Sequence, residues 1–119
     1  MGVKLDMFAA EANPRVCEAG ETVFREFEMG AEMYIILEGE VQLTIGSSVV
    51  ETLGPGEPFG EMALIDQAPR VATATAKTRC ALMVIPEKRF LFMVQTTPHF
   101  ALQMMKVMAD RLRTMNARM

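Results

Sequence analysis

The stretch "FGEMALIDQAPRVATA", Phe59–Ala74, decides the fold and the function that this sequence predicts. Within it Gly60 and Glu61 stand side by side, and Arg70 follows in the same predicted loop. An ordinary surface loop requires neither the "GEMAL" segment nor the "PRVA" segment. Together they contain a flexible backbone position, a carboxylate and a guanidinium. A binding site for a ribose phosphate requires all three.

Each residue type in this stretch suits one part of a nucleotide monophosphate. Gly60 lets the backbone approach a ligand, and Glu61–Ile65 is long enough for one helical turn whose first N–H groups attract anions. Arg70 can fork onto phosphate oxygens, whereas an ionised Glu61 only accepts hydrogen bonds and so suits a ribose hydroxyl. Ala72 is small enough for a close approach. The alternative is a surface ion pair between Glu61 and Arg70, which would add little to stability.

The segments around this stretch read as short strands separated by glycine turns. Strands are predicted at 21–27, at 33–45 as two strands with a bend at Gly39, and at 49–53, 71–76 and 79–85. Gly46-Ser47 suits a tight hairpin turn, and Gly54–Pro58 cannot continue a strand because proline lacks the N–H donor. One helical turn is predicted over Leu5–Ala10. Regular short strands of this kind predict an antiparallel sandwich or roll over about 15–85.

Two helices are predicted after the strands. Pro86 suits the first turn of a short helix, and Thr97-Pro98 suits the N-cap and first position of a second helix that runs to the C-terminus. Apolar residues recur in the second helix at alternating intervals of four and three, which makes one stripe. This apolar seam consists of Ala101, Met105, Met108, Leu112, Met115 and Met119. Two roles are open for the seam: it packs against the roll of the same chain, or it joins two copies in a dimer. In either case the helix could also act as a movable lid.

Composition excludes several classes of function. The 119 residues fit a single domain, 1–119, and the net charge of -3 argues against a nucleic-acid partner. No apolar run reaches the roughly 18 residues of a membrane span, and no secretory signal opens the chain, so we expect a cytoplasmic protein without membrane insertion. His99 is the only histidine, which argues against a metal site and against an enzyme. Cys17 and Cys80 lack CxxC spacing and are expected to be reduced and half-buried.

At the opening stretch the sequence resembles the cyclic nucleotide-binding domain family. The phosphate-binding cassette of that family has the form F-G-E-(L/M)-A-L-(I/L), a short gap, then P-R-x-A-(T/S), and Phe59–Ile65 and Pro69–Thr73 match it throughout. The resemblance runs from about Cys17 to the C-terminal helix. It implies a mainly β fold with flanking helices: an eight-stranded antiparallel, jelly-roll-like β-roll, a short phosphate-binding helix and two C-terminal helices over about 86–119.

The resemblance also implies a role for each site residue. Glu61 would accept a hydrogen bond from the ribose 2′-OH, and Arg70 would pair with the cyclic phosphate. The phosphate cradle would be completed by backbone groups of Gly60, Met62, Ala63 and Ala72. Leu43 and Ile45 would wall the purine and ribose. In the family the last helix often folds over the base, but no motif fixes which residue caps it; the candidates are Met108, Arg111, Leu112 and Met115.

One departure from the family pattern bears on the choice of ligand. Family members selective for cyclic GMP often have Thr or Ser directly after the arginine, whereas this chain has Val71, which offers no hydrogen bond. We therefore expect cyclic AMP in preference to cyclic GMP. The prediction is a non-enzymatic sensor, with no cofactor besides its ligand, that repositions its C-terminal helices for an effector protein or a second copy. The alternative is a β-roll interaction module that binds no nucleotide.

Overall fold

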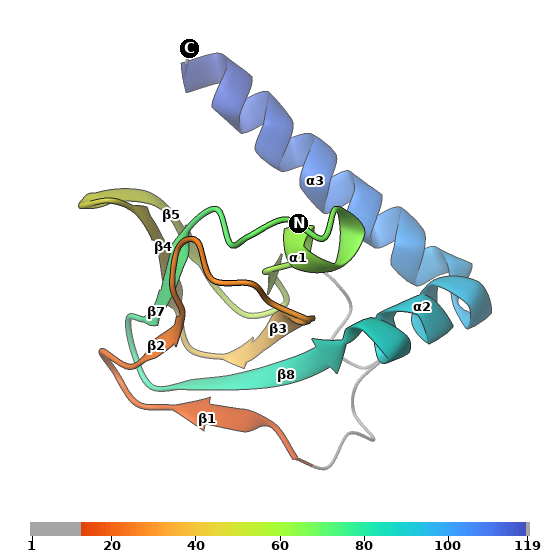
Figure 1. The fold of residues 1–119 in the computed structure, drawn as a ribbon, viewed down its shortest axis with the longest axis horizontal. Helices are drawn as coiled ribbons and strands as arrows, with labels where there is room; N and C mark the ends of the chain where they lie inside the picture. Colours follow the sequence, from red (N-terminus) through yellow and green to blue (C-terminus); the bar gives the residue numbers. More distant parts are fainter. Residues whose placement is uncertain (1–12, 119) are drawn as a thin grey trace.

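The computed structural model describes residues 13–118, which fold into a roll of two four-stranded sheets (Figure 1). The strands are β1 (Arg15–Cys17), β2 (Thr22–Phe24), β3 (Glu32–Glu38), β4 (Val41–Ile45), β5 (Ser48–Leu53), β6 (Pro58–Phe59), β7 (Thr73–Ala76) and β8 (Cys80–Pro86). One sheet has the order β1-β8-β3-β6 and the other β2-β7-β4-β5. The neighbouring strands run antiparallel. The predicted fold class, an antiparallel eight-stranded roll with flanking helices, is therefore confirmed.

Three helices accompany the roll. They are α1 (Met62–Ile65), α2 (Glu87–Thr96) and α3 (Pro98–Arg118). Pro86 is the N-cap residue of α2, Glu87 lies in its first turn, and α3 begins at Pro98, so both predicted helix starts are confirmed. In Figure 1, α2 continues from β8, and α3 then turns back and passes above α1. None of the helices in residues 13–118 has the length and hydropathy that crossing a bilayer would take.

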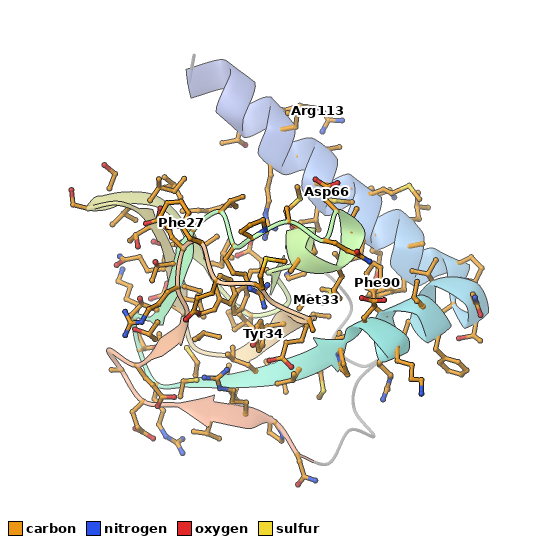
Figure 2. The ribbon with its side chains drawn as sticks, in the orientation of Figure 1. Phe27, Met33, Tyr34, Asp66, Phe90 and Arg113 are labelled. Carbon is orange, nitrogen blue, oxygen red and sulfur yellow. The ribbon has the colours of Figure 1, made fainter. Side chains whose placement is uncertain are left out.

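Strand β3 is buried on both faces because the roll covers one face and the helices cover the other. Successive residues of a strand point to opposite faces. Tyr34, which is labelled in Figure 2, faces the inside of the roll. Its ring stacks on that of Phe59 with 5.2 Å between the ring centroids. Met33 and Ile35 belong instead to a second cluster, which includes Phe100 of α3. Burial on both faces explains why "MYII" reads as a continuous apolar run.

The apolar seam is not the face of α3 that packs most tightly on the domain. Among the α3 side chains that the structure describes, the buried ones are Phe100, Met104 and Val107. Met105 and Leu112 of the seam are each 59% exposed, and Met115 and Met119 lie outside the residues whose side chains the structure describes. Packing of the seam against its own roll is therefore wrong for Met105 and Leu112. The physical reason is that both stripes recur at intervals of four and three, so periodicity alone cannot say which one faces the roll.

Three other sequence-based expectations differ from the structure. The strand predicted at 21–27 ends at Phe24, because the chain then turns and Phe27 adopts a positive φ of 72°. The strand predicted at 71–76 begins at Thr73, because Arg70 is paired with the β2–β3 loop through Glu28 and Phe27. The two cysteines are free, as expected, but fully rather than half buried. The helical turn predicted at Leu5–Ala10 lies outside the described residues.

Candidate functional site

Arg70 is a buried cation held by neutral groups. It is 5% exposed, and its guanidinium donates from Nη1 to the carbonyl of Gly60 and from Nη2 to the carbonyl of Glu32, each at 2.8 Å. The same group lies over the Phe24 ring, 4.1 Å from its centroid. Within residues 13–118, no carboxylate lies within ion-pair distance of it. Because a buried charge without a directly contacting carboxylate is costly, this position favours the arrival of an anion.

Two glycines make room for this guanidinium. Gly60 has a φ of +79°, and a Cβ built there would lie 2.9 Å from Nη1 of Arg70 and 3.1 Å from the Phe24 ring. A Cβ at Gly30 would lie only 2.3 Å from Nη2 of Arg70. Real Cβ atoms do not approach other atoms so closely, so either substitution would displace the arginine. Gly60 also needs its left-handed backbone conformation, which glycine adopts at little cost.

The protein environment changes the proton affinity of Arg70 without discharging it. Burial lowers the pKa of its guanidinium, and the nearby Tyr34 and Glu32 act in the opposite direction. An arginine in a protein stays protonated at neutral pH. The charge is therefore permanent, and only an incoming ligand or a rearranged carboxylate can neutralise it. In the described part of the chain, no three His, Cys, Asp or Glu side chains gather closely enough to hold a metal ion.

Glu61 is also buried, but its partner comes from α3. The Glu61 side chain is 7% exposed, and its Oε1 accepts a hydrogen bond from Nη1 of Arg111 at 2.8 Å. Arg111 also donates to the carbonyl of Pro58, and its Nε lies 3.8 Å from a carboxylate oxygen of Glu51. The alternative of a surface Glu61–Arg70 ion pair is therefore wrong, since both side chains are buried and have separate partners. The contact joins the candidate site directly to the C-terminal helix.

The short helix α1 places backbone donors next to Glu61. The carbonyl of Glu61 accepts from the N–H groups of Leu64 and Ile65, each at 3.0 Å. The N–H groups of Met62 and Ala63 lie earlier in the turn, where no preceding helical carbonyl is available to them. The predicted single turn over 61–65 is confirmed as α1, Met62–Ile65. Both N–H groups therefore remain as donors beside Gly60.

The other predicted site residues occupy a range of environments. Ala72 is 6% exposed, whereas Val71 is 62% exposed and directs its side chain away from the core. Leu43 is half-buried, packs against the core of the roll and pairs in register with Ala74 just after the cassette. Ile45 is 49% exposed at the end of the hairpin. The structure therefore brings Leu43 close to the cassette strand, while Ile45 lies further out.

Sequence reasoning missed several residues that shape the site. Phe24, Gly30 and Glu32 hold or border Arg70, and they come from β2, the following loop and β3. A hollow of about 400 Å³ adjoins Arg70 on this side. A second hollow of about 180 Å³ lies beside Arg111 and Glu51. No local motif marks these residues, because only the closure of the roll brings them to Arg70.

Fold and site together define a class of protein. Within residues 13–118, the roll buries an arginine with no carboxylate at ion-pair distance, next to a glycine, the N–H groups at the start of α1 and a glutamate that can accept from hydroxyls. These groups are suited to bind a small anionic ligand that carries hydroxyl groups.

The chain belongs to the cyclic nucleotide-binding domain family, whose family model matches residues 14–97. A cyclic nucleotide-gated potassium channel of Rhizobium etli is 37% identical over 98 residues, which are 82% of this chain and 27% of the channel. The crystal structure of the Thermus thermophilus catabolite activator protein superposes with a TM-score of 0.82 at 28% identity, covering 96% of this chain and 56% of that one.

A third relative comes from a cyclic-GMP-dependent signalling pathway that regulates bacterial phytopathogenesis. Its structure superposes with a TM-score of 0.79 at 25% identity, covering 96% of this chain and 98% of that chain. The curated relatives are longer: this chain spans 27% of the potassium channel and 46% of a cyclic AMP-activated transcriptional regulator of Mycobacterium tuberculosis. The resemblance to cyclic nucleotide-binding domains is thus confirmed, and it concerns a binding domain that larger proteins combine with other parts.

Proposed function

We propose that this chain is a non-enzymatic, cytoplasmic sensor that binds cyclic AMP and transmits binding through α3. The observation that carries the proposal is the buried guanidinium of Arg70, which has no carboxylate partner in residues 13–118. A singly charged cyclic phosphate would neutralise it. Membership of a cyclic nucleotide-binding family supports this choice of anion.

The phosphate is proposed to lie between Arg70 and the start of α1. The hydrogen bonds from Arg70 to the carbonyls of Gly60 and Glu32 use only part of its donor capacity, since a guanidinium has five N–H donors. The remaining donors can turn to phosphate oxygens. The N–H groups of Met62 and Ala63, with the backbone of Gly60 and Ala72 close to the ligand, would complete the cradle.

The ribose is proposed to bind Glu61 while the hydrogen bond between Arg111 and Glu61 stays in place. Arg111 uses Oε1 of the carboxylate, which leaves Oε2 as an acceptor for the 2′-OH. Arg111 then fixes the orientation of Glu61 and adds a positive charge near an anionic ligand. The ribose, Glu61 and Arg111 form one continuous chain of contacts that ends on α3.

The base is proposed to lie toward β4, with Leu43 and Ile45 as its wall. Val71 provides no hydroxyl group for the amino group of guanine, and this favours cyclic AMP over cyclic GMP. The names of the relatives point to both nucleotides: a further relative from Thermus thermophilus is named a cyclic AMP receptor protein, and another relative belongs to a cyclic-GMP-dependent pathway. The side chain at position 71 therefore carries the preference.

The output is proposed to be a change in the position or order of α3. A ligand shifts a conformational equilibrium only by binding one arrangement more tightly than the other. The Arg111–Glu61 contact forms only when α3 lies against the roll. A ligand that binds Glu61 in the orientation set by Arg111 would therefore bind this arrangement more tightly than one in which α3 has moved away. The exposed seam residues Met105 and Leu112 would then be presented to an effector or to a second copy.

Calorimetric titration of the purified chain with cyclic AMP, cyclic GMP and linear AMP tests the proposal. We expect cyclic AMP to bind with a dissociation constant of micromolar or below, which corresponds to roughly -8 kcal/mol or better. Cyclic GMP should bind more weakly, and linear AMP, with its second phosphate charge and open ring, more weakly still. Tenfold tighter binding of cyclic GMP would contradict the argument from Val71. Absence of binding to any of the three would favour an interaction module with an empty roll.

A further inference from the structure

The two cysteines of the chain lie directly opposite each other on neighbouring strands. Cys17 of β1 is paired in register with Cys80 of β8. Directly opposed residues of an antiparallel pair share a face and have Cα atoms about 4.5 or 5.5 Å apart, and both distances fall within the range of roughly 4.4–6.8 Å that a disulfide spans. Both side chains belong to the same buried cluster inside the roll, and both are free thiols. A bond between them therefore needs rotation of the side chains and little backbone movement.

While β1 is in place, the roll encloses both thiols and shields them from reagents in solution. The single proton of the Cys80 thiol can be donated to the carbonyl of Glu40 at 3.0 Å or to that of Thr78 at 3.2 Å. Burial raises the pKa of the Cys17 thiol; the charge of Arg15 lowers it and that of Glu21 raises it. The thiolate is the reactive form of cysteine and must be reached by the oxidant, so both buried cysteines react slowly while β1 is in place.

The position of β1 at the sheet edge allows an oxidant to reach the two cysteines. β1 has three residues and, among the strands of residues 13–118, lies at the edge of its sheet with β8 as its one neighbour. Short edge segments open locally at lower free energy than the centre of a fold. When β1 separates from β8, both thiols lose their burial, and the pKa of the Cys17 thiol returns toward that of an exposed cysteine. When β1 returns, the register places the two sulfurs together.

We propose that the β1–β8 edge is a covalent modification site at which Cys17 and Cys80 form a reversible disulfide with each other when they meet a small disulfide such as oxidised glutathione. One protein thiolate attacks the glutathione disulfide, forms a mixed disulfide and releases one glutathione thiolate. The second protein thiolate attacks the protein sulfur of that mixed disulfide and releases the second glutathione. The two protons of the protein thiols go to the two released thiolates, and the two electrons reduce the glutathione disulfide.

The disulfide would link β1, the first strand of the roll, covalently to β8, the strand that leads into the helices. β8 ends at Pro86 and continues into α2 and α3. A disulfide between Cys17 and Cys80 would close a long loop, which lowers the entropy of the unfolded chain and stabilises the fold. Neither cysteine belongs to the phosphate cassette, so the inference is independent of the proposed nucleotide function.

Intact-mass spectrometry of the native chain after incubation with oxidised glutathione tests the site. The wild type should lose about two mass units without forming dimers, and digestion should yield one linked peptide pair that contains both cysteines. Its melting temperature should rise by several degrees and return when a reductant is added. Oxidation should be faster at higher pH, since it proceeds through the thiolate.

The variants Cys17→Ala and Cys80→Ala serve as matched controls. Each should gain one glutathione at the remaining cysteine and show no loss of two mass units. The wild type unfolded in denaturant confirms that the reagent reacts with both thiols. A native wild type that stays fully reduced, that holds two separate glutathione groups, or that forms linked dimers would overturn the proposal. If a variant proves unstable, the peptide map of the wild type alone still decides between these outcomes.

Discussion

Replacement of Arg111 by alanine removes the contact that joins the ribose acceptor to α3. The Arg111–Glu61 contact spans 2.8 Å between side chains that are 19% and 7% exposed, so solvent screens it weakly. A hydrogen bond to a charged group contributes about 1.5–3 kcal/mol, and we expect Arg111→Ala to lower the free energy of unfolding by about 2 kcal/mol. For a chain of 119 residues this corresponds to a fall in melting temperature of roughly 8 °C.

The same substitution should weaken nucleotide binding and uncouple it from α3. Glu61 would lose the group that orients it, and the ligand would lose a nearby positive charge, so we expect about tenfold weaker binding of cyclic AMP, or roughly 1.4 kcal/mol. Hydrogen exchange should show that cyclic AMP protects α3 in the wild type and fails to do so in Arg111→Ala. Arg113→Ala is the matched control, because Arg113 is 73% exposed and pairs with Asp110 of the same helix. It should change stability by less than about 0.5 kcal/mol.

A double-mutant cycle with Glu61→Gln isolates the contact itself. If Arg111 acts through Glu61, the loss caused by Arg111→Ala should shrink in the Glu61→Gln background, with a coupling energy of at least about 1 kcal/mol. Strict additivity would refute the reasoning. So would an Arg111→Ala protein that binds cyclic AMP as tightly as the wild type and still shows protection of α3.

Three further predictions concern packing, pH and the seam. Gly30→Ala should lower both the melting temperature and the affinity for cyclic AMP, because the added Cβ would lie 2.3 Å from the buried guanidinium of Arg70. A Gly30→Ala protein that binds cyclic AMP with wild-type affinity in calorimetric titration would contradict this. Burial raises the pKa of the Tyr34 phenol and of the Cys17 thiol, so stability should be constant below their ordinary pKa values and fall as pH rises above about 9, which denaturant unfolding from pH 7 to 11 checks. Met105→Glu with Leu112→Glu should turn a dimer into a monomer in analytical ultracentrifugation if the seam joins two copies, and should weaken nucleotide binding without a change of mass if α3 acts as a lid.

Local patterns predicted the fold well because each carries its own physical constraint. Gly46 at the hairpin turn and Pro98 at the start of α3 each restrict the backbone in a way that a short segment reveals. The cassette motif located Gly60, Glu61 and Arg70 together, and the structure gathers all three around α1. Residues adjacent in sequence therefore needed little tertiary information.

The features that sequence could not predict depend on the closure of the roll. Gly30 meets Arg70 across two loops, and Cys17 meets Cys80 only through strand register. The spacing of α3 permits two neighbouring stripes, so it could not show that Phe100 faces the roll while Met105 faces outward. The surface ion pair of Glu61 with Arg70 failed as an interpretation for the same reason, since the partner of Glu61 comes from a helix far along the chain.

The central claim, that Arg70 is the buried cation for a cyclic phosphate, is tested most directly by calorimetric titration of Arg70→Ala and Arg70→Lys with cyclic AMP beside the wild type. Because Arg70 is buried and hydrogen-bonded, both variants should melt at lower temperature, so thermal melts must first show that each is folded at the titration temperature. Arg79→Ala, which alters an exposed arginine, is the control.

Truncation of one partner of a buried charge pair costs about 2–5 kcal/mol, so Arg70→Ala should bind cyclic AMP roughly 30-fold to several thousand-fold more weakly than the wild type. Arg70→Lys keeps the positive charge but loses the planar guanidinium that can make two parallel hydrogen bonds. Its affinity for cyclic AMP should therefore lie between those of the wild type and Arg70→Ala. Arg79→Ala should bind like the wild type. A folded Arg70→Ala protein that binds cyclic AMP with wild-type affinity would contradict the account.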